Sequence, residues 1–162
     1  MKIVIIDDEK NCRIVLRDKL LKHDSSFNIV GEAYGVESGI DLIQQEKPDL
    51  VFLDIQMNDG TGFDLLNKIK YKNFHLIFTT AFDQYAIKAF KYTAIDYLLK
   101  PVDFNELSNA VKRVLELNSK RDFTEGFLAT YEKDSFDTIC LRTEDNVQEV
   151  ELADIESIKA EG

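Results

Sequence analysis

The sequence predicts an α/β protein with a doubly wound, five-stranded parallel sheet, because short apolar runs alternate with segments of helical periodicity. Residues 3–6, 50–53 and 76–78 are continuously apolar, which is the pattern of strands buried on both faces. Weaker runs lie at residues 27–30 and 95–99. Five strands alternating with five helices and joined by right-handed crossovers predict helices on both faces of the sheet.

The segments between the strands carry apolar residues on one helical face. These faces comprise Cys12, Val15, Leu16 and Leu20; Val36, Ile40 and Ile43; and Phe104, Leu107, Val111, Val114 and Leu115. Asp103 precedes the last segment and predicts an N-cap, since its carboxylate can accept hydrogen bonds from the free backbone amides at the start of a helix. The two cysteines, Cys12 and Cys140, match no metal or redox spacing, and we expect Cys12 to pack in the core.

Charge and hydropathy exclude several classes of function. Residues 1–118 hold 15 basic and 18 acidic side chains, and residues 119–162 hold 5 basic and 12 acidic ones. Neither segment offers the basic surface that phosphate-backbone binding requires, so we expect no nucleic-acid binding by this chain alone. No apolar run is long enough to span a membrane and no signal peptide pattern opens the chain, which predicts a cytoplasmic protein.

The pattern of the first 118 residues ends before the C-terminal part of the chain. We predict an α/β domain at residues 1–118, a linker or frayed helix extension at 119–134, and a short C-terminal β segment at 135–162. Two or three strands cannot form an independent core, so this segment is expected to be the incomplete start of a second domain. A disordered acidic tail is the alternative.

Acidic residues follow two of the predicted strands. Asp7 and Asp8 end the first strand, and Asp54 ends the third. The carboxyl ends of parallel strands meet at one edge of the sheet, where sites form. Carboxylates packed together repel one another unless a cation compensates, and oxygen ligands of this kind favour Mg²⁺ over Zn²⁺.

Two further strands add a hydroxyl group and an ammonium group to this edge. The fourth strand ends at Thr80 and the fifth at Lys100. Such a set can neutralise the oxygens of a phosphoryl group while Asp54 attacks phosphorus to form an aspartyl phosphate. Each residue alone has an ordinary explanation as a helix start, a turn residue, a cap or a solvated lysine. Their combination at four of five strand ends predicts phosphoryl chemistry.

The motifs that carry these residues resemble those of a receiver domain from a two-component response regulator. They are Ile5-Ile6-Asp7-Asp8-Glu9, Phe52-Leu53-Asp54-Ile55-Gln56-Met57, Thr80-Ala81 and Asp96-Tyr97-Leu98-Leu99-Lys100-Pro101. The four motifs in this order are highly specific, and the resemblance covers residues 1 to about 118. It implies a flavodoxin-like fold with strand order 2-1-3-4-5, an order taken from the family.

The resemblance assigns the phosphoryl chemistry to matched residues. Asp54 becomes the phosphoacceptor, and a sensor histidine kinase becomes its partner. Asp8, Asp54 and the backbone carbonyl of Gln56 become ligands of Mg²⁺, with Asp7 holding a metal-bound water. Lys100 would pair with a phosphoryl oxygen and precede a cis peptide bond.

The resemblance also assigns residues that respond to phosphorylation. Thr80 and Tyr97 match the family's switch pair, although Tyr97 taken alone equally fits a half-buried strand aromatic. Gln56 and Phe82 occupy positions that tune the lifetime of the phosphoryl group. The chain departs from the family at Asn58, where a proline is frequent, and we expect a more flexible loop with an added carboxylate, Asp59, near the site.

The C-terminal residues resemble the beginning of a LytTR-type DNA-binding domain. This resemblance rests mainly on Ala-Asp-Ile-Glu-Ser-Ile-Lys-Ala-Glu-Gly at residues 153–162. It implies a transcription regulator that contacts DNA only through a missing C-terminal part and is not a turnover enzyme, and a homodimer is a possible partner state.

Two other functions fit parts of the pattern. A phosphatase of the haloacid dehalogenase type also uses a strand-end aspartate and Mg²⁺, but it needs an acid two residues later, where this chain has Gln56. A stand-alone receiver with an unstructured tail would act through protein contacts only.

Overall fold

The computed structural model describes residues 1–85, 89, 92–131, 138–142 and 147–151. The chain divides into two compact units, Met1–Glu116 and Leu117–Gly162.

The first unit contains a parallel sheet of five strands, as the sequence predicts. They are β1 (Lys2–Ile6), β2 (Asn28–Ala33), β3 (Leu50–Leu53), β6 (His75–Thr80) and β7 (Asp96–Leu99). Their order is β2-β1-β3-β6-β7, which is 2-1-3-4-5 when only these five are numbered. Two short strands, β4 (Gln56–Met57) and β5 (Gly60–Thr61), form a separate antiparallel pair after β3.

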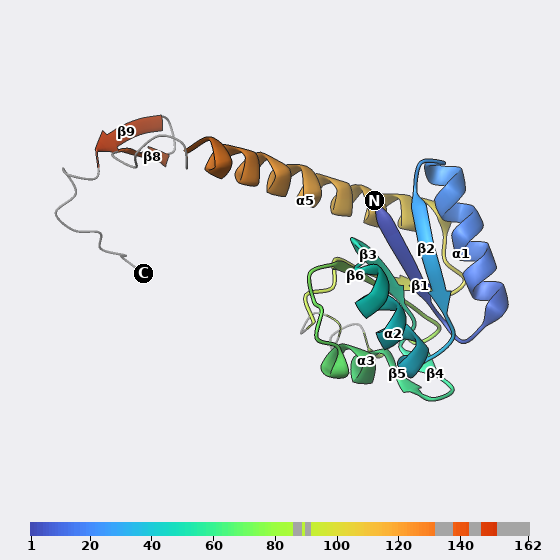
Figure 1. Cartoon of the computed structure of the whole chain (residues 1–162). Helices are drawn as coiled ribbons and strands as arrows, with labels where there is room; N and C mark the ends of the chain where they lie inside the picture. The colour runs from blue at the N-terminus through green and yellow to red at the C-terminus, as the bar shows by residue number, and fades with distance from the viewer. Residues whose placement is uncertain (86–88, 90–91, 132–137, 143–146, 152–162) are drawn as a thin grey trace. The chain divides into compact units, whose positions relative to one another are not determined.

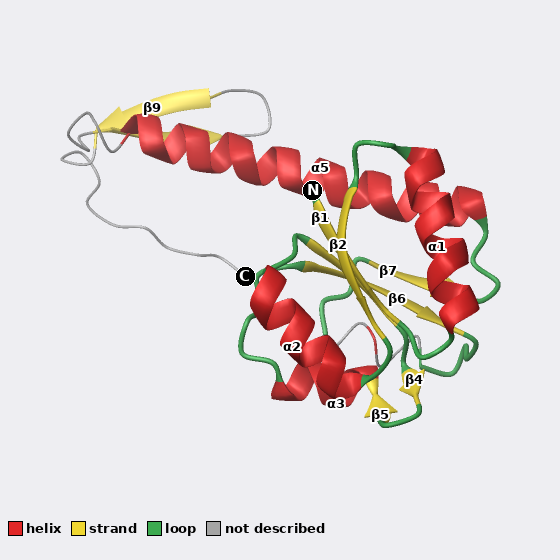
Figure 2. Cartoon of the chain, turned by 45° about the vertical axis from the view of Figure 1, so that its right-hand side comes forward, coloured by secondary structure: helices red, strands yellow, loops and turns green. Residues whose placement is uncertain are grey.

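Helices cover both faces of this sheet (Figures 1 and 2). On one face, α1 (Lys10–His23) and the first part of α5 (Phe104–Tyr131) bury a cluster that includes Leu20, Phe52 and Val111. On the other face lie α2 (Val36–Glu46) and α3 (Gly62–Lys68). The fourth predicted helix, between β6 and β7, falls largely on residues 86–88 and 90–91, outside the described residues.

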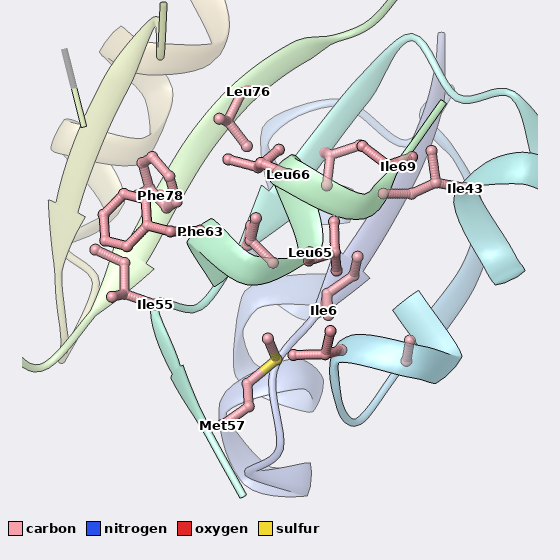
Figure 3. Packing of buried hydrophobic residues seen from close by; sticks show 14 of the residues in the cluster. Ile6, Ile43, Ile55, Met57, Phe63, Leu65, Leu66, Ile69, Leu76 and Phe78 are labelled. Carbon is pink, nitrogen blue, oxygen red and sulfur yellow. The ribbon is translucent and has the colours of Figure 1, made fainter. Parts of the chain in front are cut away.

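The face under α2 and α3 is packed around aromatic and branched side chains (Figure 3). Phe63 of α3 lies against Phe78 of β6, with their ring centroids 5.3 Å apart. Leu65 of α3 and Ile6 of β1 are fully buried in the same cluster. These contacts hold α3, and with it the loop that follows β3, against the sheet.

Two positions assigned to apolar helix faces are exposed instead. Val15 in α1 is 50% exposed and Leu115 in α5 is 39% exposed. Each lies about 100° around its helix from a buried neighbour, Leu16 and Val114 respectively, so the buried stripes are narrower than predicted. The predicted N-cap of α5 is confirmed, because the Asp103 carboxylate accepts the backbone amide hydrogens of Asn105 and Glu106.

The second unit contains the end of α5, which continues to Tyr131, and an antiparallel pair of strands. These are β8 (Thr138–Arg142) and β9 (Val147–Glu151), the short β segment expected at the C-terminus. Residues 152–162, which carry the resemblance to a DNA-binding domain, lie outside the described residues. Among the described helices, none has the length and apolar character needed to cross a bilayer.

Candidate functional site

The hydrogen bonding between neighbouring strands continues for one residue beyond the ends of β1, β3 and β7. These bonds hold the backbone of the site residues in place. The amide of Asp7 donates to the carbonyl of Ala33 at 3.1 Å, and the amide of Asp54 donates to the carbonyl of Ile6 at 2.8 Å. The amide of Lys100 donates to the carbonyl of Thr80 at 2.8 Å. Residues that are far apart in sequence therefore meet at the carboxyl edge of the sheet.

Three carboxylates converge at this edge. Ligand oxygens of Asp7, Asp8 and Asp54 all lie within 4.8 Å of one another. Asp7 is 2% exposed and Asp54 is 4% exposed, while Asp8 is half-buried. Carboxylates removed from water at such short range need a compensating cation.

Lys100 supplies one positive charge to the three carboxylates. Its Nζ lies 2.5 Å from Oδ2 of Asp54 and 2.8 Å from Oδ2 of Asp7. Burial alone would lower the pKa of Lys100, but hydrogen bonds to Asp54 and Asp7 outweigh it and raise the pKa above its ordinary value. The lysine is therefore a fixed ammonium at neutral pH.

A single ammonium does not balance the acidic cluster. Burial raises the pKa of Asp7 even though hydrogen bonds from Lys100 and from the amide of Glu9 act in the opposite direction. Oxygen-only ligands at a partly open edge are the donor set that suits a hard divalent ion such as Mg²⁺. The described residues thus fit the metal that the sequence analysis predicts.

The hydroxyl group at the end of β6 is buried without a partner. Oγ1 of Thr80 has no hydrogen-bond partner among the described residues. A buried unsatisfied hydroxyl costs about 1–3 kcal/mol, a cost that an acceptor placed at this edge would remove. Tyr97 is half-buried beside Phe78, and its hydroxyl donates to the backbone carbonyl of Phe82.

The loop after β3 is shaped closely around Asp54. The backbone amide of Gln56 donates to Oδ1 of Asp54 at 3.2 Å, while the Gln56 side chain donates to the hydroxyl of Tyr85 at 2.9 Å. A Cβ atom at Gly62 would lie 2.4 Å from the carbonyl oxygen of Asp54, so only glycine fits there. The peptide bond between Lys100 and Pro101 is cis, as the resemblance implies.

Comparison with known proteins shows the family of the domain that carries this edge. Residues 3–112 match the family model described as "Response regulator receiver domain". The chain belongs to this family. It is the receiver domain of a two-component response regulator together with the residues that follow it.

Curated relatives of this receiver include named regulators. It is 44% identical over 116 residues to the sensory transduction protein LytR of Staphylococcus haemolyticus, covering 70% of this chain and 45% of that protein. It is 40% identical over 123 residues to the transcriptional regulatory protein BtsR of Escherichia coli, covering 75% and 51%. The chain spans about half the length of the curated relatives it matches.

Solved receiver structures have the same fold. The response regulatory domain of mrkE from Klebsiella pneumoniae aligns with a TM-score of 0.66 at 27% identity, covering 74% of this chain and 99% of that one. The REC domain of AraT from Geobacillus stearothermophilus also aligns with a TM-score of 0.66, at 29% identity, covering 74% and 97%.

The structure brings together four of the predicted site residues, whereas the side chains of the other three are not part of this cluster. Asp7, Asp8, Asp54 and Lys100 form the receiver's acidic edge. The backbone carbonyl of Thr80 accepts the amide hydrogen of Lys100, whereas the side chains of Gln56 and Tyr97 donate hydrogen bonds to the hydroxyl of Tyr85 and the carbonyl of Phe82. The roles of all seven remain predictions.

Sequence reasoning missed several neighbours of the receiver's acidic edge. Arg13 donates to the backbone carbonyl of Asp7 at 2.6 Å and pairs with Glu32 of β2 at 3.2 Å. Glu9 lies 3.4 Å from Nζ of Lys100. Cys12, expected in the core, is half-buried, and a carboxylate oxygen of Asp7 lies within 4.8 Å of its sulfur. The contacts of Arg13 with Glu32 and of Glu9 with Lys100 join distant segments, so no local pattern in the sequence signals them.

Asp59 does not join the acidic edge. Its carboxylate accepts hydrogen bonds from the amides of Val36 and Glu37 at the start of α2, at 2.9 Å and 3.4 Å. Among the described residues, it is absent from the clusters that could hold a metal ion. The added carboxylate that the sequence predicts near the site is thus held by the helix amides and is not one of the clustered ligands.

Proposed function

We propose that the chain accepts a phosphoryl group on Asp54 from a sensor histidine kinase and changes conformation in response. The observation that carries this proposal is the buried position of Asp54, with Lys100 at 2.5 Å and two further carboxylates nearby. This arrangement provides a nucleophile and a fixed cation in one place.

The proposed reaction also requires Mg²⁺, bound at the acidic edge. Asp8, Asp54 and the backbone carbonyl of Gln56 would hold it, with Asp7 holding a metal-bound water. When bound, the ion would neutralise charge on the phosphoryl oxygens. An oxygen of Asp54 forms the new bond to phosphorus as the bond from phosphorus to the donor breaks, and Lys100 pairs with a phosphoryl oxygen.

Phosphorylation would be transmitted through Thr80 and Tyr97. The Thr80 hydroxyl is buried without a partner among the described residues and could donate to a phosphoryl oxygen. Tyr97, now bonded to the carbonyl of Phe82, could turn inward once Thr80 has moved. Such a change shifts an equilibrium between two conformations. Gln56 and Phe82 would tune how long the phosphoryl group persists.

The output of the switch is proposed to be transcriptional. Relatives of the receiver include a sensory transduction protein and a transcriptional regulatory protein, each about twice as long as the matched region. We assign residues 119–134 to a linker and 135–162 to the opening of a LytTR-type DNA-binding domain. The chain would then act as a regulated acceptor and not as a turnover enzyme.

Labelling with a small phosphoryl donor tests the acceptor. The purified chain is incubated with acetyl phosphate and Mg²⁺, and its intact mass is measured. We expect a gain of one phosphoryl group that is acid-stable and base-labile, and that does not form when Mg²⁺ is absent. Asp54→Asn should abolish the gain.

Asp49→Asn is the matched control, because Asp49 lies at the other end of β3, where its exposed carboxylate accepts from the amide of Lys2. This control should label like the wild type. Continued labelling of Asp54→Asn at the same rate would move the acceptor to another residue and defeat the proposal.

A further inference from the structure

The start of α2 has no cap from its own chain segment. Gly35 is its N-cap residue and has no side chain, so the first amides of the helix need an acceptor from elsewhere. Asp59, which lies 23 residues after Val36 and 22 after Glu37, supplies that acceptor by binding both of their amides. A carboxylate at a helix N-terminus is also favoured by the helix dipole.

The absence of a side chain at Gly35 makes room for this contact. A Cβ atom there would lie 2.6 Å from both carboxylate oxygens of Asp59. The backbone of Gly35 is fully extended, with φ −177° and ψ −178°, a conformation open to any residue. The contact with the Asp59 carboxylate therefore favours glycine at position 35, whereas the backbone angles of Gly35 do not.

Asp59 lies at the tip of the loop that also carries Gln56. Residues 56–57 pair with 60–61 in the short β4–β5 hairpin, and the amide of Gly62 donates to the carbonyl of Ile55 at 2.9 Å. The hairpin is thus closed at its base, while its tip is joined to α2 through Asp59. Both ends of the loop are held.

We propose that Asp59 is a positioning residue, which by capping α2 holds the loop so that the Gln56 backbone carbonyl is in place for Mg²⁺. This inference rests on the proposed function, because it concerns the same metal site. Partners that orient metal ligands typically contribute 10- to 100-fold to metal affinity. Asp59 would thereby replace, with a contact between elements, the rigidity that proline gives this loop in other receivers.

The test measures Mg²⁺ affinity by titration calorimetry and reads the cap itself by amide hydrogen exchange at Val36 and Glu37. Asp59→Ala should weaken Mg²⁺ binding about tenfold and speed exchange at both amides. Asp59→Asn, which keeps one acceptor oxygen, should lie between this variant and the wild type. Asp41→Ala, which removes an exposed carboxylate from the middle of α2, is the charge control and should bind Mg²⁺ normally.

Gly35→Ala tests the contact from the other side. The added methyl group should push the Asp59 carboxylate off the helix and weaken Mg²⁺ binding by a similar factor. In the double variant Gly35→Ala/Asp59→Ala the two effects should not add, because both remove one interaction. Additive losses would show that the two residues act separately and would overturn the proposal.

A rebuilt cap separates positioning from mere stabilisation. In Gly35→Ser/Asp59→Ala, the serine hydroxyl can cap α2 from within its own segment. Thermal stability, lowered by about 5 °C in Asp59→Ala, should return, whereas Mg²⁺ affinity should stay low. Recovery of both would show that Asp59 is only a cap. A wild-type chain that binds no Mg²⁺ would instead defeat the proposed function, so the two failures are distinct.

Discussion

At the scale of single residues, the acidic edge opposes folding when no metal is bound. Asp7 is almost fully buried, and burial raises the pKa of its carboxyl group above the ordinary value of 3.8. A carboxyl group whose pKa is higher in the folded state binds its proton more tightly there. Stability therefore falls as pH rises through that pKa, and ionised Asp7 weakens the folded state at neutral pH.

Asp7→Asn should consequently stabilise the metal-free chain at neutral pH. We expect a gain of about 0.5–2 kcal/mol in the free energy of unfolding, the usual size of such trade-offs between function and stability. The gain should shrink as pH falls below the ordinary range for aspartate, where wild-type Asp7 is protonated in both states. Urea unfolding in the presence of a chelator, at several pH values, measures it. If the stabilisation by Asp7→Asn instead grew toward low pH, the pKa of Asp7 would not be raised in the folded state.

Lys100 is expected to contribute to phosphoryl transfer more than to metal binding. Lys100→Met removes the ammonium that lies against Asp54 and Asp7 but leaves the acidic ligands in place. The rate of Asp54 labelling by acetyl phosphate should fall about 10²-fold, as when a donor to a developing charge is removed. Mg²⁺ binding should persist. Lys112→Met, on the exposed surface of α5, is the control, and equal rates for both variants would refute the role of Lys100.

At the scale of elements, the strands were predictable because their residues are apolar on both faces. β1, β3 and β6 are almost completely buried, and each contains the continuous run that the sequence shows. The acidic edge followed, since topology brings strand ends together. β2 was less clear in sequence, since Gly31 and Glu32 interrupt its apolar pattern and Glu32 pairs with Arg13 of α1.

Contacts between elements were beyond the reach of sequence periodicity. The boundary of a buried stripe depends on what the neighbouring helix and loops cover, so Val15 and Leu115 were misassigned. The Asp59 cap was missed for the same reason, because its acceptor and donors belong to separate segments. In each case the sequence indicated the helix or the loop correctly, but it did not show which residues of other segments contact it.

Packing of α3 on the sheet is expected to provide much of the stability of this face. Leu65 is fully buried, and Leu65→Ala should cost about 2–5 kcal/mol in the free energy of unfolding, since a cavity would remain. Leu21→Ala makes the same chemical change on α1, where the side chain is 39% exposed, and should cost less than about 1 kcal/mol. Urea unfolding compares them. Equal costs would mean that α3 is not anchored by this contact.

At the scale of the whole molecule, the chain divides within α5, two residues after the buried Val114. The first unit ends at Glu116, and Val114 is the last buried core residue within the part of α5 whose side chains are described, up to Asn118. All the residues proposed for phosphoryl transfer, metal binding and switching lie in this unit. A domain that contains its own core and its own site can fold and function without the rest of the chain.

A chain that ends at residue 118 should therefore keep the chemistry of the full chain. We expect cooperative unfolding with a midpoint close to that of the full chain, because no described core residue of the first unit is removed. Labelling of Asp54 by acetyl phosphate and Mg²⁺ should proceed at the same rate, since the acidic edge, Thr80 and Lys100 are all retained. Calorimetry and intact-mass measurement check these two expectations. Loss of cooperative unfolding would show that residues after 118 are part of the fold, and lost labelling in a folded fragment would show that they contribute to the site.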